Sequence, residues 1–343
     1  MGENMANTVR SVSEEEKAKE RQPALVCRSL CKEFDIRDRK FPYTIRKLKA
    51  VSDVSLRIER GETLGIVGES GSGKSTLGRL IMRLTEPTSG EVWLNGHNLT
   101  AISGEELRRI RHRFQIIFQD PYAAFNPRMT IQKILEEPLT AAGLPADQWQ
   151  QKIDQILDMT GIPKDAKKRY PHEFSGGQRQ RIGIARAILT SPDLIVADEP
   201  VSALDVSIQA QILNLMKDLQ EELGSSMVFI SHNMASVQYI SHHIAVMYLG
   251  RIVEIAGSDA LYENALHPYT KALIETIPIP VPGKGRERRR LEGEVPSPID
   301  LPEGCVFAKR CPMASEICTK KTPVLQEQGN GHLVACHLYD TME

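Results

Sequence analysis

Hydrophobic positions along the chain follow two periodicities. Short apolar runs at residues 62–67, 113–118, 194–198 and 227–231 predict β-strands that alternate with helical patterns, as in an α/β fold. The last two runs are apolar without alternation, which is typical of parallel strands covered on both faces. Between them, residues 207–223 repeat apolar side chains at helical spacing, and we interpret this stripe as core packing. The stripe consists of Ile208, Ile212, Leu215, Met216 and Leu219.

The same patterns divide the chain into regions. Helical patterns replace the strands from about residue 120 to residue 189, so we expect a helical subdomain inserted into the α/β core. Residues 244–257 predict a closing hairpin that turns at Leu249 and Gly250. A run rich in Pro, Gly and charge at residues 277–304 predicts a linker. We therefore expect a mobile tail over residues 1–22, a main domain over residues 23–260 and a small, cysteine-rich C-terminal extension over residues 261–343.

Length and charge narrow the class of protein. At 343 residues the chain is long enough for one large domain and an appendage. Its 43 Lys and Arg nearly cancel its 44 Asp and Glu, and this balance gives no electrostatic reason to expect nucleic-acid binding. No apolar run approaches the ~18 residues of a membrane span, and the charged N-terminal stretch lacks the apolar region of a secretory signal. We expect a cytosolic protein whose thiols stay reduced.

A glycine-rich loop predicts nucleotide binding. The stretch GESGSGKST at residues 68–76 matches the pattern G-x-x-x-x-G-K-[ST] and stands between a predicted strand and an amphipathic helix. Its glycines let successive backbone N–H groups turn toward phosphate oxygens, and the helix that follows directs its positive end at the same anion. We expect Lys74 to reach the β- and γ-phosphates and the Ser75 hydroxyl to ligate Mg²⁺. The residues expected to bind ATP here are Gly68, Glu69, Ser70, Gly71, Ser72, Gly73, Lys74, Ser75 and Thr76.

Two carboxylates follow the apolar strand at residues 194–198, in the stretch LIVADEP. Asp198 can hold Mg²⁺ through water and so complete the pair with Ser75. Glu199 can then take a proton from the attacking water as a general base. A pair of solvated loop acids is the plainer alternative, but the position at the end of a buried strand favours the catalytic interpretation.

The stretch FSGGQRQRIGIARAIL at residues 174–189 resembles the signature sequence of ATP-binding-cassette (ABC) ATPases, with Phe174 in place of the usual leucine. It is a second glycine-rich helix start and hence a second candidate anion site. The resemblance implies a P-loop NTPase core with an antiparallel β edge and a head-to-tail pair of cassettes, in which each signature faces the ATP of the other. A single cassette per chain requires a second ABC ATPase subunit as partner. The matching residues are Ser175, Gly176, Gly177 and Gln178.

Further motifs match this family in the same order along the chain. Gln119 in FQDP resembles the Q-loop glutamine, which contacts Mg²⁺ or water and precedes the segment that meets the membrane subunit. His232 in ISHNM resembles the switch histidine that senses the γ-phosphate. Phe34 resembles the aromatic residue that stacks on adenine, with Tyr43 as a rival. The D-loop at the subunit interface is matched by SALD, that is Ser202, Ala203, Leu204 and Asp205.

Other stretches resemble one branch of the family, the dipeptide and oligopeptide importers. They read ADEPVSALDVSIQAQILNLM, HPYTKAL and EGEVPSP. This resemblance implies a peripheral, energy-coupling ATPase at the cytoplasmic face of the cell membrane. Its implied partners are a related but different cassette, two membrane-spanning permease subunits and an extracytoplasmic substrate-binding protein. Nickel, opine and glutathione importers share the branch, so the cargo stays open. Two different functions also stay open, those of a soluble ABC protein and of a redox sensor that uses ATP only as a structural ligand.

Four cysteines near the C-terminus are spaced C-x5-C-x6-C-x17-C. Zinc sites usually bring ligands in pairs about two to four residues apart, whereas a [4Fe–4S] cluster tolerates broad spacings; unligated core thiols are the third alternative. The importer resemblance also implies an iron–sulfur cluster. We therefore predict a [4Fe–4S] cluster, with zinc as the alternative, on Cys305, Cys311, Cys318 and Cys336, and we expect Cys27 and Cys31 to be core residues.

Overall fold

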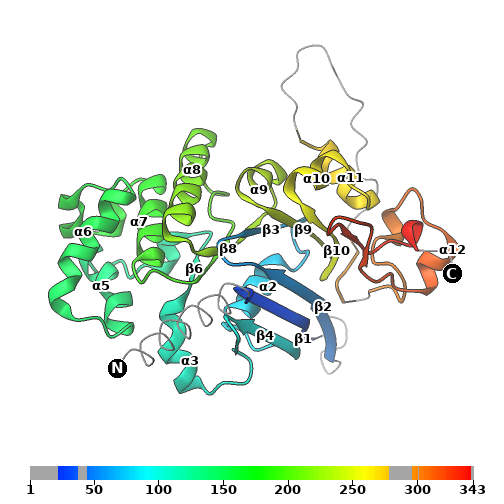
Figure 1. Ribbon diagram of the computed structural model, residues 1–343, viewed down its shortest axis with the longest axis horizontal. Coiled ribbons are helices and arrows are strands. Elements are labelled where there is room, and N and C mark those ends of the chain that lie inside the picture. Colours follow the sequence, from blue (N-terminus) through cyan, green and yellow to red (C-terminus); the bar gives the residue numbers. More distant parts are fainter. Residues whose placement is uncertain (1–21, 38–44, 278–295, 300, 341–343) are drawn as a thin grey trace, which may run out of the picture.

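The computed structural model of the chain describes residues 22–37, 45–277, 296–299 and 301–340. Two β-sheets enclose helix α2 (Lys74–Ile81) (Figure 1). The larger sheet has the strand order β11-β12-β10-β9-β3-β8-β7-β6, and the smaller sheet has the order β2-β1-β4-β5. The expected N-terminal tail, Tyr43 and most of the expected linker lie outside the described residues.

Strands β3 (Thr63–Val67), β8 (Ser226–Ser231), β7 (Leu194–Asp198) and β6 (Phe114–Ile117) lie side by side and run parallel. Alternate residues of β8 belong to different cores, because Met227 and Phe229 pack on one face of the sheet and Val228 and Ile230 on the other. A strand that is buried on both faces has no position for polar alternation. The four strands predicted from the apolar runs are therefore confirmed.

The segment between β6 and β7 forms helices joined by turns and contains no strand among its described residues, which confirms the predicted helical insertion. The elements are α4 (Pro121–Ala124), α5 (Ile131–Ala141), α6 (Trp149–Met159) and α7 (Gly176–Ile188). The three longer helices, α5 to α7, present apolar faces to a shared core that includes Ile134, Leu157 and Ile182. Figure 1 shows this group at one end of the molecule.

Helix α8 (Val206–Leu223) follows β7 and carries the predicted apolar stripe. Ile212, Met216 and Leu219 are buried, whereas Ile208 and Leu215 are partly buried and pack against the same core. The next helix is α9 (Met234–Ile240), which packs against β3 and β8. The stripe therefore has the packing role that its spacing predicts.

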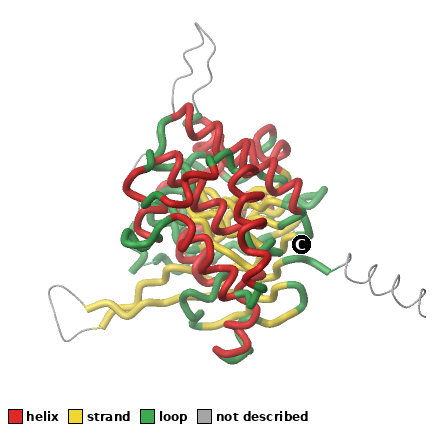
Figure 2. Tube along the Cα trace, turned by 90° about the vertical axis from the view of Figure 1, so that its left-hand side faces the viewer, coloured by secondary structure: helices red, strands yellow, loops and turns green. Residues whose placement is uncertain are grey.

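Strands β9 (His243–Tyr248) and β10 (Arg251–Gly257) form the predicted hairpin. Its two turn residues, Leu249 and Gly250, both have positive φ, of 42° and 81°. The smaller sheet is antiparallel, which confirms the antiparallel edge implied by the family resemblance. Its long β1–β2 pair projects from the rest of the molecule in Figure 2. The strands are β1 (Leu25–Arg37), β2 (Ile45–Ile58), β4 (Ser89–Leu94) and β5 (His97–Asn98), and α3 (Gly104–Ile110) follows them.

The C-terminal segment is attached to the edge of the larger sheet. Strand β12 (Leu333–Val334) pairs with β10, and β11 (Gln326–Glu327) pairs with β12. The fully buried carboxylate of Glu254 joins three parts of the chain, since it accepts hydrogen bonds from the backbone N–H groups of Leu266 and His267 and contacts His332 Nε2 at 2.7 Å. A buried carboxylate needs such partners to offset its lost hydration. The helices of this region are α10 (Ser258–Glu263), α11 (Pro268–Glu275) and α12 (Glu316–Lys320).

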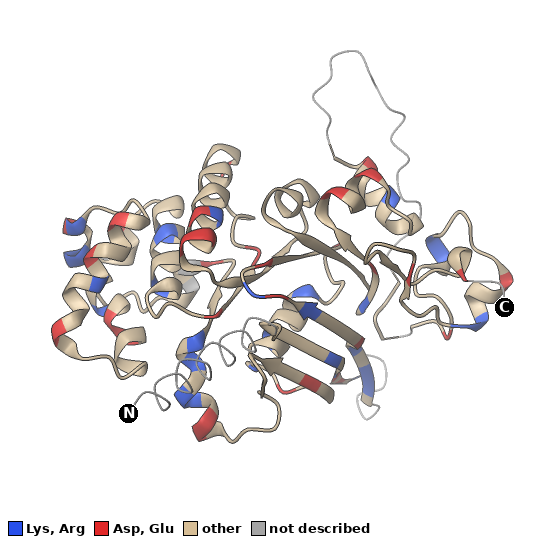
Figure 3. Cartoon of the chain, viewed as in Figure 1, with Lys and Arg blue, Asp and Glu red and all other residues tan. Residues whose placement is uncertain are grey.

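Charged side chains are interspersed over the molecule. Figure 3 shows Lys and Arg alternating with Asp and Glu on the described elements, in keeping with a formal net charge of -1. Within the described ranges, every helix is too short or too polar to span a membrane.

Candidate functional site

The glycine-rich loop connects β3 to α2, and close backbone contacts explain two of its glycines. A Cβ atom on Gly68 would lie 2.1 Å from the carbonyl oxygen of Met247. At Gly73 a Cβ would lie 2.2 Å from the carbonyl oxygen of Ala50, and its φ of 102° is itself strained for any other residue. Only glycine fits such positions. The loop is therefore held between the β9–β10 hairpin and β2.

Lys74 is the first residue of α2, and its side chain is folded into the loop. Its Nζ donates hydrogen bonds to the carbonyl oxygens of Gly68 and Glu69, at 2.8 and 2.9 Å. Burial lowers the pKa of Lys74, although the negative charges of Glu199, Asp198 and Glu69 oppose this shift. Two loop carbonyls thus hold an ammonium group in the loop, where it can bind a phosphate.

Ser75 and Asp198 lie next to each other at the start of α2 and the end of β7. The Ser75 hydroxyl donates to Asp198 Oδ1 at 2.7 Å. Burial raises the pKa of Asp198, and this hydrogen bond opposes the shift. A hydroxyl and a carboxylate oxygen at this spacing are the hard oxygen ligands that Mg²⁺ prefers, so the pair fits the predicted role.

The Glu199 carboxylate contacts two other predicted site residues. Its Oε2 accepts a hydrogen bond from Gln119 Nε2 at 3.2 Å and lies 3.2 Å from His232 Nδ1. Its backbone has a φ of 49°, a left-handed conformation that is unfavourable for a glutamate. Strain of this kind is retained where the surrounding structure fixes a functional group. The carboxylate is thus oriented by an amide and an imidazole beside the Ser75–Asp198 pair.

The D-loop touches the same group, a contact that the sequence patterns do not reveal. Gln119 Nε2 also donates to Ser202 Oγ at 3.1 Å, and Ser202 Oγ donates to the backbone carbonyl of Glu199 at 3.1 Å. The next D-loop residues, Ala203 and Asp205, are exposed. Ser202 therefore links the expected subunit interface to the carboxylate expected to activate water.

The signature lies away from these residues. Ser175 caps α7 with a capping box, in which its Oγ accepts from the backbone N–H of Gln178 and its own N–H donates to the Gln178 side chain. Ser175, Gly176 and Gln178 are exposed. In the described part of the chain, no hydrogen bond or ion pair joins the signature to the phosphate loop, and Figure 1 shows α7 and α2 apart.

Replacement of Gly177 by alanine should destabilise the contact between α7 and α8. A Cβ at Gly177 would lie 2.7 Å from Ile208 Cγ2, so Ile208 would have to move. Overpacking of this kind typically lowers the free energy of unfolding by about 1–3 kcal/mol. The matched control is Gly176→Ala, because a Cβ there would make only an ordinary contact of 3.6 Å with Leu204. Thermal unfolding of both variants measures the difference, and equal stabilities would contradict the expected clash.

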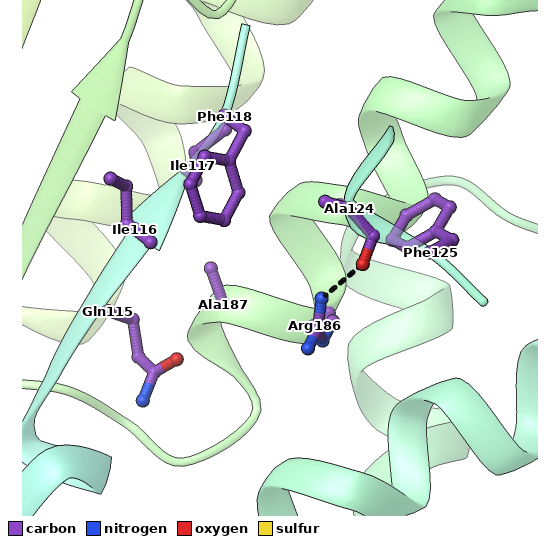
Figure 4. Close-up of a pocket in the computed structure, with 9 residues that line it drawn as sticks. Gln115, Ile116, Ile117, Phe118, Ala124, Phe125, Arg186 and Ala187 are labelled. Atoms are coloured by element: carbon purple, nitrogen blue, oxygen red, sulfur yellow. Dashed lines mark hydrogen bonds between the residues drawn. The ribbon is translucent and has the colours of Figure 1, made fainter. Parts of the chain in front are cut away.

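A pocket of about 80 Å³ lies between the end of β6, α4 and α7 (Figure 4). Ile117, Phe118 and Phe125 line it with apolar groups, and Arg186 Nη1 donates to the carbonyl oxygen of Ala124 at its rim. Phe118 directly precedes Gln119. The pocket therefore lies next to the segment that carries Gln119.

The adenine-stacking prediction concerns Phe34 on β1 and its rival Tyr43. Phe34 is 38% exposed on β1, with Lys32 Nζ 5.0 Å from its ring centroid. Tyr43 lies outside the described residues. An exposed ring at this place is available to stack on a base, and the role of Phe34 stays a prediction.

The prediction of a [4Fe–4S] cluster on Cys305, Cys311, Cys318 and Cys336 is wrong, and so is its zinc alternative. No group of three or more His, Cys, Asp or Glu side chains in the described ranges is arranged to hold a metal ion. All the cysteines are free thiols.

Packing explains the C-terminal thiols instead. Cys305 is buried in the main core, and Cys311 and Cys318 pack against it. Burial, with smaller contributions from the neighbouring thiols, raises the pKa of Cys305 to about 11. Burial is also the main cause that raises the pKa values of Cys311 and Cys336. Protonated thiols in apolar surroundings act as small hydrophobic side chains. The metal-binding role that the family resemblance implied for these cysteines is therefore not supported.

Near the N-terminus, Cys27 is buried as expected. Cys31 is half-buried, and its sulfur accepts a hydrogen bond from the backbone N–H of Asp53.

Comparisons with known proteins agree with this geometry. A family model described as ABC transporter matches residues 51–202, and one described as oligopeptide/dipeptide transporter, C-terminal region, matches residues 253–318. The chain is 48% identical over 327 residues to the oligopeptide transport ATP-binding protein AppF of Bacillus subtilis. That alignment covers 94% of this chain and 99% of AppF.

Two solved structures share the fold. The dimeric ATP-binding cassette MJ0796, in a post-hydrolysis state bound to ADP and Pi, is 28% identical with a TM-score of 0.61, over 68% of this chain and 98% of its own. The protein cbiO1 of Clostridium perfringens, part of the ABC transporter complex cbiONQ, is 25% identical with a TM-score of 0.60, over 71% of this chain and 91% of its own. The chain is therefore a member of the ABC transporter ATP-binding proteins, in the branch of the oligopeptide and dipeptide transporters.

Proposed function

We propose that this chain is the ATP-hydrolysing, energy-coupling subunit of an importer for dipeptides or oligopeptides. The observation that carries the proposal is the contact of Glu199 with both Gln119 and His232, next to the Ser75–Asp198 pair. This arrangement suits a carboxylate that activates water beside a bound triphosphate. The name of AppF and the family match at residues 253–318 support a peptide cargo.

In this proposal the phosphates of ATP lie along residues 68–76. Backbone N–H groups of the loop and the Lys74 ammonium bind the β- and γ-phosphates, and Phe34 stacks on adenine. Mg²⁺, when bound by Ser75, Asp198 and Gln119, would neutralise charge on the phosphates. Glu199 accepts the proton of the attacking water, and His232 helps to hold the carboxylate in position through Oε2, the oxygen that Gln119 also contacts.

A second cassette would complete the site. The signature residues cap a helix whose N-terminal end is free in this chain, so that an anion brought by a partner can bind there. Val206, directly after the D-loop, has 82% of its surface exposed, and a second cassette could cover it. We infer that the partner is a related but different chain, as the importer resemblance implies. When the two cassettes close, a change at Ser202 would then reach Glu199 through the hydrogen bonds of Ser202 with Gln119 and with the Glu199 backbone.

Coupling to the membrane would use the pocket after β6. We propose that a permease subunit inserts an apolar segment against Phe118 and Phe125, on the cytoplasmic face of the membrane. Two such permeases and an extracytoplasmic binding protein would complete the importer. Residues 261–343 would form the extension typical of this branch, a view supported by the family match at residues 253–318.

Affinity purification of the tagged chain from detergent-solubilised membranes tests the proposal. We expect polytopic membrane proteins and a second cassette to co-purify, and deletion of the chain to abolish uptake of labelled di- or oligopeptides. Uptake of nickel, an opine or glutathione in place of peptides would keep the ATPase role and correct the cargo. Association with ribosomes or DNA, with no membrane partner, would contradict the transport function.

A further inference from the structure

The phosphate loop is tied to the C-terminal segment by an ion pair between residues 241 positions apart. Arg310 ends a short 3₁₀ helix, Ala308–Arg310, and its side chain is only 6% exposed. Its Nη1 donates to Glu69 Oε2 at 2.7 Å, and its Nη2 donates to Glu69 Oε1 at 3.1 Å. Two parallel N–H···O bonds fix both the position and the orientation of a carboxylate. Glu69 is the second residue of the GESGSGKST loop.

An aromatic cluster of Tyr248, Tyr269 and Phe307 packs next to this ion pair. The Tyr269 hydroxyl accepts a hydrogen bond from the backbone N–H of Glu69 at 2.9 Å, and Arg310 Nη1 also donates to the Tyr248 hydroxyl at 3.3 Å. The Phe307 ring lies 5.3 Å from that of Tyr248 and 5.4 Å from that of Tyr269, and all three residues are fully buried. Arg310 thus holds the side chain of Glu69, and Tyr269 holds its backbone.

The contact continues to the lysine of the loop. The carbonyl oxygen of Glu69 accepts a hydrogen bond from Lys74 Nζ at 2.9 Å. A carboxylate in this loop stands near the place where a triphosphate is expected to bind, and two negative groups in a partly buried site repel each other. Arg310 offsets the charge of Glu69 and directs the carboxylate toward the C-terminal segment. Without it, Glu69 would be an unpaired anion in an anion-binding loop.

We propose that Arg310 is a positioning residue for ATP, through which the C-terminal segment completes the phosphate loop. The inference rests on the proposed nucleotide site at residues 68–76. It assigns the C-terminal segment a direct influence on nucleotide affinity, in addition to any contact with other subunits. Coupling between two parts of a protein is commonly equivalent to roughly 5- to 150-fold in affinity, and we expect an effect in this range.

Titration of the full-length chain with Mg·ATP tests this inference. Arg310→Gln should weaken ATP binding by roughly 5- to 150-fold, and in ATPase assays it should raise KM more than it lowers kcat. Arg310→Lys should lie between this variant and the original chain, because lysine keeps the charge but cannot bind both carboxylate oxygens at once. Lys309→Gln is the matched control, since Lys309 lies on the same helical turn with an exposed side chain and should leave ATP binding unchanged.

A double variant separates positioning from a merely structural role. Arg310→Gln with Glu69→Gln removes the unpaired carboxylate, so it should recover most of the ATP affinity that Arg310→Gln loses. If Arg310→Gln binds ATP normally, or if the double variant binds no better than Arg310→Gln, the inference is wrong. Lys74→Ala separates this inference from the proposed function. If Lys74→Ala binds ATP as the original chain does, the nucleotide site itself is wrong. If Lys74→Ala loses ATP binding while Arg310→Gln binds ATP normally, only the role of Arg310 is wrong.

Discussion

Substitution of Glu199 by glutamine should lower the rate of ATP hydrolysis by about 10²- to 10⁴-fold, the usual contribution of a general base. Glutamine has nearly the shape of glutamate and can still contact Gln119 and His232, but it cannot accept the proton of the attacking water. The phosphate contacts come from other groups, chiefly the loop amides and Lys74. We therefore expect the variant to retain ATP affinity and to accumulate in an ATP-bound, closed pair of cassettes.

The rate of hydrolysis is measured as phosphate release by the assembled transporter. The ATP affinity is measured on the same preparation. Glu222→Gln is a suitable control, because Glu222 lies exposed on α8 and should leave hydrolysis unchanged. Full turnover by Glu199→Gln would remove Glu199 from the role of base. A loss of ATP binding in the same variant would show instead that the carboxylate supports the loop.

Lys74→Ala should weaken ATP binding itself, by roughly 10- to 150-fold, if the ammonium contributes the free energy of a charge-assisted hydrogen bond. Its side chain is buried among loop carbonyls and near three carboxylates, so it is the cation best placed to offset phosphate charge. Hydrolysis at saturating ATP should fall as well, because the lysine also contacts the transferred γ-phosphate in the proposed site.

The measurement is a calorimetric titration with Mg·ATP, accompanied by a thermal melt. The melt is needed because the substitution leaves the carbonyl groups of Gly68 and Glu69 without their donor. Lys271→Ala, on the exposed face of α11, serves as the control for the loss of a lysine. An unchanged titration for a folded Lys74→Ala chain would contradict the phosphate-loop assignment.

Local patterns predicted much of the fold, and the resemblance to ABC ATPases placed Gln119 and His232 in the expected site. Strands β7 and β8 are recognisable because burial on both faces leaves an unbroken apolar run, and the hairpin at Leu249–Gly250 because two strands flank a glycine. Parallel strands end at the same edge of a sheet, which is why Asp198 and His232, at the ends of neighbouring strands, come together with Ser75 and Glu199. The position of each motif at the end of a predicted strand thus indicates where its residues lie in the fold.

Contacts between distant segments could not be predicted in this way. No periodicity relates Glu69 to Arg310, and the burial of their ion pair depends on how the C-terminal segment packs on Tyr248 and Tyr269. The spacing of the four C-terminal cysteines allowed both a metal site and plain packing. The structure favours packing, because the surroundings of Cys305 are apolar and its thiol stays protonated.

ATP held between the phosphate loop of one cassette and the signature of another is the central claim. Hydrogen–deuterium exchange of the assembled transporter, carrying Glu199→Gln, tests it most directly with and without Mg·ATP. We predict that ATP protects the backbone amides of residues 68–76 and also those of residues 175–178, which lie at an exposed helix start in the single chain. Protection confined to residues 68–76 would contradict it.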